Sequence, residues 1–179
     1  MKPGLIEELS ANNTYRAQTK MIVTLSPGIH IRRLQMLLGA SFSTTRHHVD
    51  SLERAGEILR SKDGRYDRLY PIGTSESMKA VYAVLQSKTA RKVLQALLES
   101  EPHELTNGEL SELTKIPRST VSESVGQLNG ISLVRRSLTA DGRILYKVQG
   151  SEEVVKLLAS LQRNMLNIAA DRFIDLWDF

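Results

Sequence analysis

The stretch STTRHHVDSLERAGEILRSKDGRYDRLYP, residues 43–71, decides the fold of the first half of this 179-residue chain. Its first part has apolar residues at helical spacing, which predicts a helix that ends at Gly56. The apolar stripe of this helix consists of Thr45, Val49 and Leu52. EILR at 57–60 and RYDRLYP at 65–71 predict two short strands, and the Asp-Gly pair at 63–64 favours a tight hairpin turn between them. The stretch therefore predicts a helix followed by a charged β-hairpin.

Two more helices are predicted before this stretch. NTYRAQTKMIVTLS, residues 13–26, has helical periodicity with Asn13 as a candidate N-cap, and the Pro-Gly pair at 27–28 stops it. IHIRRLQMLLG, residues 29–39, has Ile and Leu at helical spacing and Gly39 as its C-terminal stop. The predicted order is helix, helix, tight turn, helix, hairpin.

The second half of the chain repeats that order. LQMLLGASFSTTRHHVDSLERAGEILR (34–60) aligns with LSELTKIPRSTVSESVGQLNGISLVRR (110–136), and DGRYDRLY (63–70) aligns with DGRILYKV (141–148). The second copy begins with a predicted helix over 87–100, and TNGELSELTKI (106–116) and PRSTVSESVGQLNG (117–130) predict its second and third helices. A period of about 76 residues is too long for a solenoid repeat, so two copies of one small domain are the better interpretation.

Two further helices complete the predicted chain. SESMKAVYAVLQ, residues 75–86, predicts a linker helix, and residues 151–179 predict a long amphipathic helix. Its apolar stripe consists of Val154, Leu158, Leu161, Met165, Ile168, Ala169, Phe173, Leu176 and Trp177. We therefore predict a mainly α fold with small β-hairpins: a first domain at 1–73, a linker helix and second domain at 74–150, and a C-terminal helix at 151–179.

The net charge is basic and unevenly distributed. The chain has 24 Lys and Arg against 20 Asp and Glu, and the two halves up to residue 150 carry the positive excess. This balance favours an anionic partner, nucleic acid before membrane. No stretch approaches the roughly 20 apolar residues of a membrane span, and the N-terminus lacks the pattern of a secretory signal. Cysteine is absent, which excludes disulfides and Cys-bound zinc. We expect a cytoplasmic protein with no membrane partner.

The predicted order is the winged helix-turn-helix plan, in which a helix enters the major groove of double-stranded DNA and the hairpin reaches phosphates or the minor groove. At 100° per residue, packing the apolar stripe inward turns short donors and cations outward. The predicted DNA contacts of the third helix are Ser43, Thr44, His47, Ser51 and Arg54, with Arg46 on the flank. Those of the hairpin are Arg60, Lys62, Arg65 and Arg68. Asp50 lies toward the same side and repels phosphate, unless it accepts a hydrogen bond from a cytosine amino group.

The second copy has a weaker face for DNA. Its predicted contacts are Arg118, Ser119 and Thr120 on the helix and Arg135, Arg136 and Arg143 on the hairpin. Glu123, at the centre of the outward face, has the wrong charge for a groove lined with phosphates. We expect the first domain to be the main DNA-contacting domain, and the second either to add hairpin contacts or to serve as a scaffold.

Other interpretations stay open at this stage. A charged hairpin beside a polar helix face is also typical of an ordinary solvated surface. His47 and His48 diverge by about 100° and do not suit one metal ion, so we expect His48 to border the core and His47 to face either DNA or solvent. No HExxH motif, Walker loop or carboxylate cluster is present. We expect no catalytic residues, no metal site and no cofactor.

Residues 26–73 resemble archaeal transcription regulators with two winged helix-turn-helix domains. The motifs that carry the resemblance are Pro27–His30, Arg46–Val49, Asp63–Arg65 and Tyr70-Pro71. RSTVSESVGQL (118–128) and SLVRR (132–136) are similar to the broader MarR- and ArsR-like group, which often has a basic residue or His near the position of Glu123. The resemblance implies sequence-specific DNA binding and transcriptional regulation.

The C-terminal segment, residues 151–179, looks like the dimerising helices of such regulators, which implies a homodimer on a palindromic site. The alternative is that this helix packs back on its own domains. The second functional hypothesis is a tandem winged-helix scaffold that binds proteins and not DNA.

Overall fold

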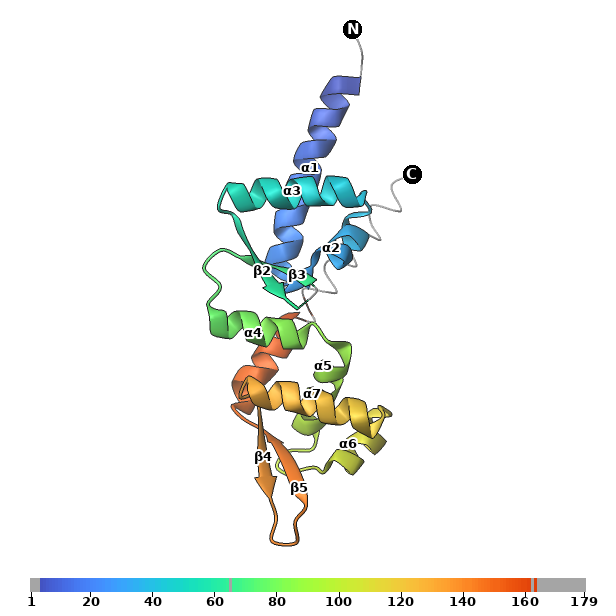
Figure 1. The fold of residues 1–179 in the computed structure, drawn as a ribbon, viewed down its shortest axis with the longest axis vertical. Helices are drawn as coiled ribbons and strands as arrows, with labels where there is room; N and C mark the ends of the chain where they lie inside the picture. The colour runs from blue at the N-terminus through green and yellow to red at the C-terminus, as the bar shows by residue number, and fades with distance from the viewer. Residues whose placement is uncertain (1–3, 65, 162, 164–179) are drawn as a thin grey trace. The chain divides into compact units, whose positions relative to one another are not determined.

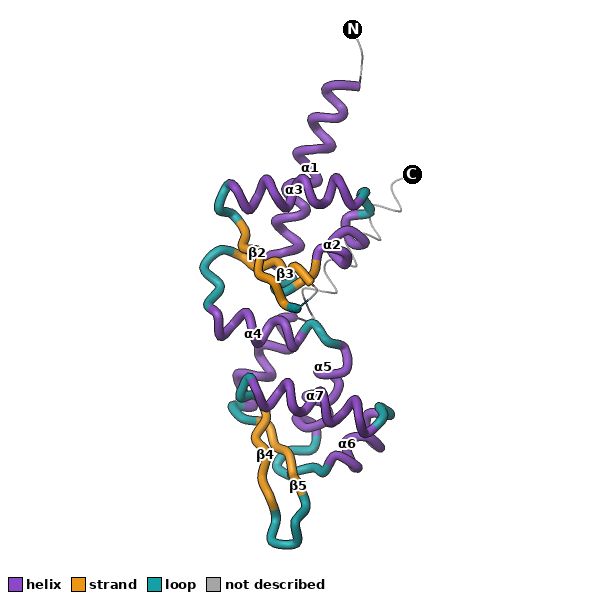
Figure 2. Tube along the Cα trace, in the orientation of Figure 1, coloured by secondary structure: helices purple, strands orange, loops and turns teal. Residues whose placement is uncertain are grey.

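The computed structural model describes residues 4–64, 66–161 and 163, with side chains from residue 14 onward. The chain divides into two compact units, the first built on the residues up to Lys79 and the second on Ala80–Gln162 (Figure 1). Helices dominate each unit, and the strands form small antiparallel hairpins (Figure 2). The predicted fold class, mainly α with small β-hairpins, is therefore confirmed.

The first unit consists of three helices and a hairpin, with one short extra strand. Its elements are α1 (Gly4–Leu25), β1 (Ile29–His30), α2 (Ile31–Leu38), α3 (Phe42–Arg54), β2 (Ile58–Asp63) and β3 (Tyr66–Pro71). The three strands form an antiparallel sheet in the order β1-β3-β2, in which Ile29 pairs with Leu69 and His30 with Arg68. The sequence did not predict β1, because two residues are too few to show a period.

The turn between α2 and α3 is built by two adjacent caps. Gly39 ends α2 in the left-handed conformation, with φ of 65°, and its N–H donates to the carbonyl of Gln35. Ser41 then caps α3 by accepting a hydrogen bond from the backbone N–H of Thr44 at 3.1 Å. Only Ala40 separates these caps, so the chain reverses in the few residues that a helix-turn-helix requires.

The second unit has the same order of three helices and a hairpin. Its elements are α5 (Lys88–Glu99), α6 (Asn107–Thr114), α7 (Arg118–Gly130), β4 (Val134–Leu138) and β5 (Ile144–Val148). Ser87 caps α5 as predicted, and a bridge between Leu105 and Tyr146 joins the start of α6 to β5. This bridge occupies the place that the β1–β3 pairing occupies in the first unit. The division between the units falls within α4 (Glu76–Leu85), the predicted linker helix.

Each unit has its own apolar core. In the first unit the fully buried residues include Val23, Leu34, Leu52 and Leu69. The core of the second unit is built around Leu94, Leu110 and Leu128 and also includes Val154, Leu158 and Leu161 from the helical residues 151–161. The start of the predicted C-terminal helix therefore packs within the second unit. The rest of its apolar stripe, from Met165 to Trp177, lies outside the described residues.

Candidate nucleic-acid interface

The helix α3 buries the face that the sequence predicts. Thr45, Val49 and Leu52 have no exposed area, and His48 is 2% exposed beside them. This face packs against α1 and α2. The opposite side of α3 is consequently turned to solvent.

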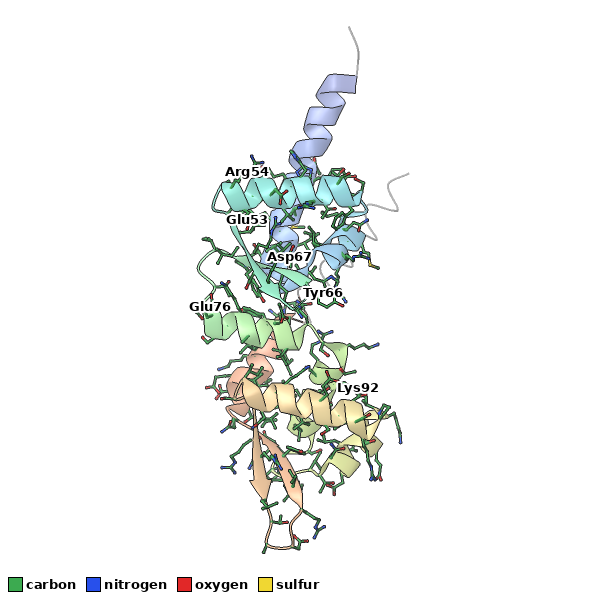
Figure 3. All side chains as sticks on the ribbon, viewed as in Figure 1. Glu53, Arg54, Tyr66, Asp67, Glu76 and Lys92 are labelled. Atoms are coloured by element: carbon green, nitrogen blue, oxygen red, sulfur yellow. The ribbon has the colours of Figure 1, made fainter. Side chains whose placement is uncertain are left out.

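The outward face of α3 carries cations and short hydroxyl side chains. Ser43, Arg46, His47 and Arg54 are exposed, and Thr44 and Ser51 are half-buried. Figure 3 labels Arg54 at the C-terminal end of this helix, where its Nε donates to the carbonyl of Asp50 at 3.1 Å. These groups are the donor types that contact phosphates and base edges in protein–DNA complexes.

The N-terminal turn of α3 holds three hydroxyls close together. The Ser41 hydroxyl lies 2.9 Å from that of Ser43 and 2.8 Å from that of Thr44. Because Ser41 also caps the helix, the other two hydroxyls are positioned by the same residue that starts α3. A hydroxyl held at a helix N-terminus is suited to donate to an anion such as a phosphate.

The hairpin β2–β3, called here the first wing, differs from the sequence expectation at two arginines. The side chain of Arg68 is only 15% exposed; its Nε lies 2.5 Å from Asp63, and its Nη1 donates to the carbonyl of Gly28 at 3.0 Å. Arg60 is 18% exposed and pairs with Asp50 and Glu53. Both side chains bind the protein itself. Lys62 is exposed, and Arg65 lies outside the described residues.

Asp50 is directed to the first wing. Its carboxylate pairs with Arg60 and lies 3.9 Å from the Nε of Arg46. The sequence left open that Asp50 repels phosphate or accepts from cytosine. In the structure these two cations already balance its charge, which reduces its repulsion of a nearby phosphate.

Two histidines of the first unit are shifted toward the neutral form. Burial is the main cause that lowers the pKa of His48, with smaller contributions from His47 and Arg16. Burial also lowers the pKa of His30, together with the positive charges of Arg68, Arg33 and Arg32. The Nδ1 of His30 accepts from the N–H of Arg33 at 3.2 Å and so caps α2. Neutral His30 is the form that this cap needs.

In the second unit, α7 buries Val121, Ser124, Val125 and Leu128. Of the predicted contacts on this helix, Arg118 and Ser119 are exposed and Thr120 is half-buried. Arg118 lies over the first turn of α6, where a Cβ on Gly108 would be 3.4 Å from its guanidinium. Glu123 is exposed at the centre of the outward face, as predicted.

The hairpin β4–β5, the second wing, keeps its cations at the surface. The side chain of Arg135 is 61% exposed and lies 3.6 Å from Glu104, and Arg136 is exposed. Arg143, 72% exposed, pairs with Asp141 at 2.5 Å. Arg135 and Arg143 are more exposed than Arg60 and Arg68 of the first wing.

Sequence reasoning missed a cluster at the start of α2. The ring of the exposed Tyr66 lies 5.6 Å from the ring of His30, in the strand pair that joins β1 to β3. Arg32 is exposed in the first turn of α2 and adds its charge to that of Arg68. The His-Ile-Arg-Arg run at 30–33 is a basic stretch that the sequence shows. These residues lie close to the wing only because β1 pairs with β3, and the sequence did not predict that pairing.

The structure holds neither a candidate membrane helix nor a metal-binding group within the part of the chain that it describes. No helix there combines the length and apolar character that crossing a membrane requires. No group of three or more His, Asp or Glu in the same residues is placed to hold a metal ion.

Comparison with known proteins gives one family match. Residues 87–135 match the model of the arsR family of bacterial regulatory proteins. No curated protein matches the chain. The match lies in the second unit and covers α5, α6, α7 and the first residues of β4.

Three solved structures that are described as transcriptional regulators match part of this chain. The reduced form of YodB from B. subtilis has a TM-score of 0.43 at 13% identity, over 50% of this chain and 88% of that chain. A probable transcriptional regulator from Pseudomonas aeruginosa has a TM-score of 0.41 at 22% identity, over 48% of this chain and 65% of that chain. A possible transcriptional regulator from Methanosarcina mazei Go1 has a TM-score of 0.38 at 17% identity, over 68% of this chain and 97% of that chain. All three TM-scores are below 0.5. The family match shows that residues 87–135 are similar to the arsR family of bacterial regulatory proteins.

Proposed function

We propose that this chain is a DNA-binding transcriptional regulator built from two winged helix-turn-helix domains, with α3 in the major groove of double-stranded DNA. The observation that carries the proposal is the division of α3 into a buried apolar face and an outward face of cations and hydroxyls, beside a wing. The family match to residues 87–135 supports the same class of function. The equal element order of the two units supports the tandem arrangement.

The two units divide the work of binding in this proposal. The outward face of α3, with Arg46, His47 and Arg54, contacts the groove, and Lys62 and Arg65 contact phosphates. In the second unit the exposed Arg135, Arg136 and Arg143 contribute phosphate contacts from the wing. Glu123 on α7 disfavours entry of that helix into a groove, so the second unit contributes mainly through its wing.

The direct test is fluorescence anisotropy of a mixed-sequence DNA duplex over a range of salt concentrations. Binding should weaken steeply with salt because Lys and Arg displace counterions from the phosphates. The double variant Arg46→Gln/Arg54→Gln should weaken binding by about tenfold or more, since each cation that contacts DNA contributes about 1 kcal/mol or more.

The matched control removes the same charge from another surface. Lys88 and Lys92 are exposed on α5 of the second unit, and Figure 3 labels Lys92. Lys88→Gln/Lys92→Gln should weaken binding by no more than about twofold at moderate salt, because neither lysine is among the proposed DNA contacts and salt screens charges that make no direct contact. Equal losses in the two double variants would contradict the assignment of α3, and no wild-type binding at low salt would contradict the function.

One observation favours a second function, a protein-binding scaffold. The outward face of α7 carries Glu123 and Gln127, joined by a hydrogen bond of 3.4 Å, in place of cations. A scaffold would leave the duplex unbound at low salt while retaining a protein partner, so the anisotropy experiment separates the two functions.

Homodimerisation through residues 151–179 remains part of the proposal. Val154, Leu158 and Leu161 are already buried in the second unit, so the proposed dimer contact would have to use the rest of the predicted apolar stripe, from Met165 to Trp177 in the sequence. Light scattering with and without DNA tests this point: a monomer in both conditions at micromolar concentration would contradict it.

A further inference from the structure

Two acids lie on the flank of α3 that is closest to the first wing. Asp50 and Glu53 are three residues apart, so they project from neighbouring turns of the same side of the helix. The side chain of each is 41% exposed. Arg46 lies on this flank as well, 3.9 Å from Asp50.

Arg60 of β2 reaches across to both acids. Its Nη2 donates to Oδ1 of Asp50 and lies 2.9 Å from Oε2 of Glu53. Only 18% of its side chain is exposed, and its Nε is buried with no hydrogen-bond partner among the described residues. A single guanidinium therefore ties the first strand of the wing to two turns of α3. A planar group with several donors is suited to such a bridge, whereas Lys offers one point charge.

The bridge also decides the charge of this surface. On α3 itself, Arg46 and Arg54 are matched by Asp50 and Glu53, so the helix carries no net charge from these four residues. Arg60 supplies the additional positive charge on the flank beside the wing. Without it, the half-exposed carboxylates of Asp50 and Glu53 would have less positive charge beside them, and they would repel the phosphates of a duplex bound to α3.

We propose that Arg60 is a positioning residue of the DNA-binding surface, which holds the first wing against α3 and neutralises Asp50 and Glu53. Arg60 acts through these two acids and does not contact phosphate. The inference rests on the proposed function, because it assigns a role within that DNA-binding surface.

A double-mutant cycle on DNA affinity tests this role. The cycle compares the effect of Asp50→Asn/Glu53→Gln in the wild-type background with its effect in the Arg60→Met background. Arg60→Met alone should lower affinity by about tenfold, since it leaves Glu53 unpaired and leaves Asp50 with only Arg46, 3.9 Å away. Adding the two acid substitutions should then recover most of that loss. In the wild-type background the same two substitutions should raise affinity only about two- to threefold.

Lys62→Met is the matched control, because Lys62 is an exposed cation on the same strand. Removing it should cost a few-fold in affinity, and the gain from Asp50→Asn/Glu53→Gln should be the same in the Lys62→Met background as in the wild-type background. If Arg60→Met behaves in the same additive way, Arg60 contacts phosphate directly and the proposal is wrong. Circular dichroism of every variant verifies that losses of affinity do not come from unfolding.

A second readout does not depend on DNA. Backbone amide hydrogen exchange of the β2–β3 hairpin should become at least about threefold faster in Arg60→Met, since the wing loses its tie to α3. Arg60→Lys should retain part of the protection, and Lys62→Met should leave it unchanged. Unchanged exchange in Arg60→Met would overturn the positioning role. Faster exchange in Arg60→Met, together with a wild-type protein that binds no duplex, would instead support the bridge and reject the proposed function.

Discussion

At the scale of single residues, His48 is a buried polar group in the packing of α3. It is 2% exposed, its ring lies 6.2 Å from that of Tyr15, and its Nε2 has no hydrogen-bond partner among the described residues. Thr19, on the same helix as Tyr15, is also fully buried, and its hydroxyl has no partner among those residues either. The contact between α1 and α3 therefore buries polar groups of both helices. Burial of the His48 ring opposes its protonation, because the charged form loses its hydration.

This burial predicts a pH-dependent stability of the first unit. Burial lowers the pKa of His48 in the folded protein, so the unfolded chain binds the proton first as pH falls. The contribution of His48 to the free energy of unfolding should be constant above about pH 6.5, where the ring is neutral in both states, and should decrease below that pH. His48→Leu should remove this part of the decrease, as measured by urea unfolding between about pH 7 and about pH 5.

His103→Gln is the control for the loss of a histidine, because His103 is exposed in the loop before α6. A pH profile of stability that is the same in His48→Leu and in the wild-type protein would contradict the assignment. A smaller dependence should persist in His48→Leu because the pKa of His30 is also lowered.

At the scale of elements, the two helices that precede α3 and α7 start with different caps. His30 caps α2 with a ring nitrogen, whereas Thr106 and Glu109 form a reciprocal capping box at the start of α6. In the box, the backbone N–H of Thr106 donates to Glu109 at 2.7 Å, and the Thr106 hydroxyl accepts from the N–H of Glu109 at 3.2 Å. The hydrogen bonds that the backbone N–H and the hydroxyl of Thr106 donate to the Glu109 carboxylate lower the pKa of Glu109.

The capping box predicts a defined loss of stability. Thr106→Ala should lower the free energy of unfolding of the second unit by about 1 kcal/mol, because it leaves an N–H at the start of α6 without a partner. Thr24→Ala is a suitable control, since the Thr24 hydroxyl only donates back to Lys20 within α1. Differential scanning calorimetry measures the effect. Equal melting temperatures for Thr106→Ala and the wild-type protein would contradict the role of the box.

The tight turn of the first unit makes a second prediction at this scale. Gly39 has a φ of 65°, a left-handed conformation that costs an L side chain about 1 kcal/mol. Gly39→Ala should therefore destabilise the first unit by about that amount, as measured by urea unfolding. Ala40→Gly, next to it, should cost less because Ala40 is not in that conformation. The opposite ranking of the two variants would show that the turn does not depend on this glycine.

At the scale of the whole molecule, each unit has a separate apolar core. Leu34 belongs to the first core and Leu94 to the second, and neither has exposed area. A cavity in one core removes contacts within that unit. The two-domain proposal therefore predicts that local stability changes in one unit at a time.

Leu34→Ala and Leu94→Ala test this independence. Each should destabilise its own unit by about 2–5 kcal/mol. Hydrogen exchange measured by mass spectrometry should become faster in the peptides of the substituted unit and stay unchanged in those of the other. Faster exchange throughout the chain in either variant would show that the two units unfold together.

The sequence by itself indicated the three helices and the hairpin of each unit, but it placed the start of the first helix wrongly, because α1 begins at Gly4 and Asn13 lies within it. Thr45, Val49 and Leu52 predicted the buried face of α3, and Gly39 and Ser87 marked helix ends, because periodicity and caps are set by residues close together in the chain. The division of charge between the two copies, with Glu123 on α7, was also visible in the sequence.

Only the tertiary structure decided which of the Lys and Arg side chains are free of partners within the protein and so available to contact DNA. Arg60 is occupied by Asp50 and Glu53, and Arg68 by Asp63 and by the carbonyl of Gly28, 40 residues away. The strand β1 likewise forms only by pairing with β3, and Leu158 is buried only by packing into the core of the second unit. Sequence spacing gives the direction of a side chain from its own element, but the acids, carbonyls and apolar surfaces that it meets come from elements that only folding brings near.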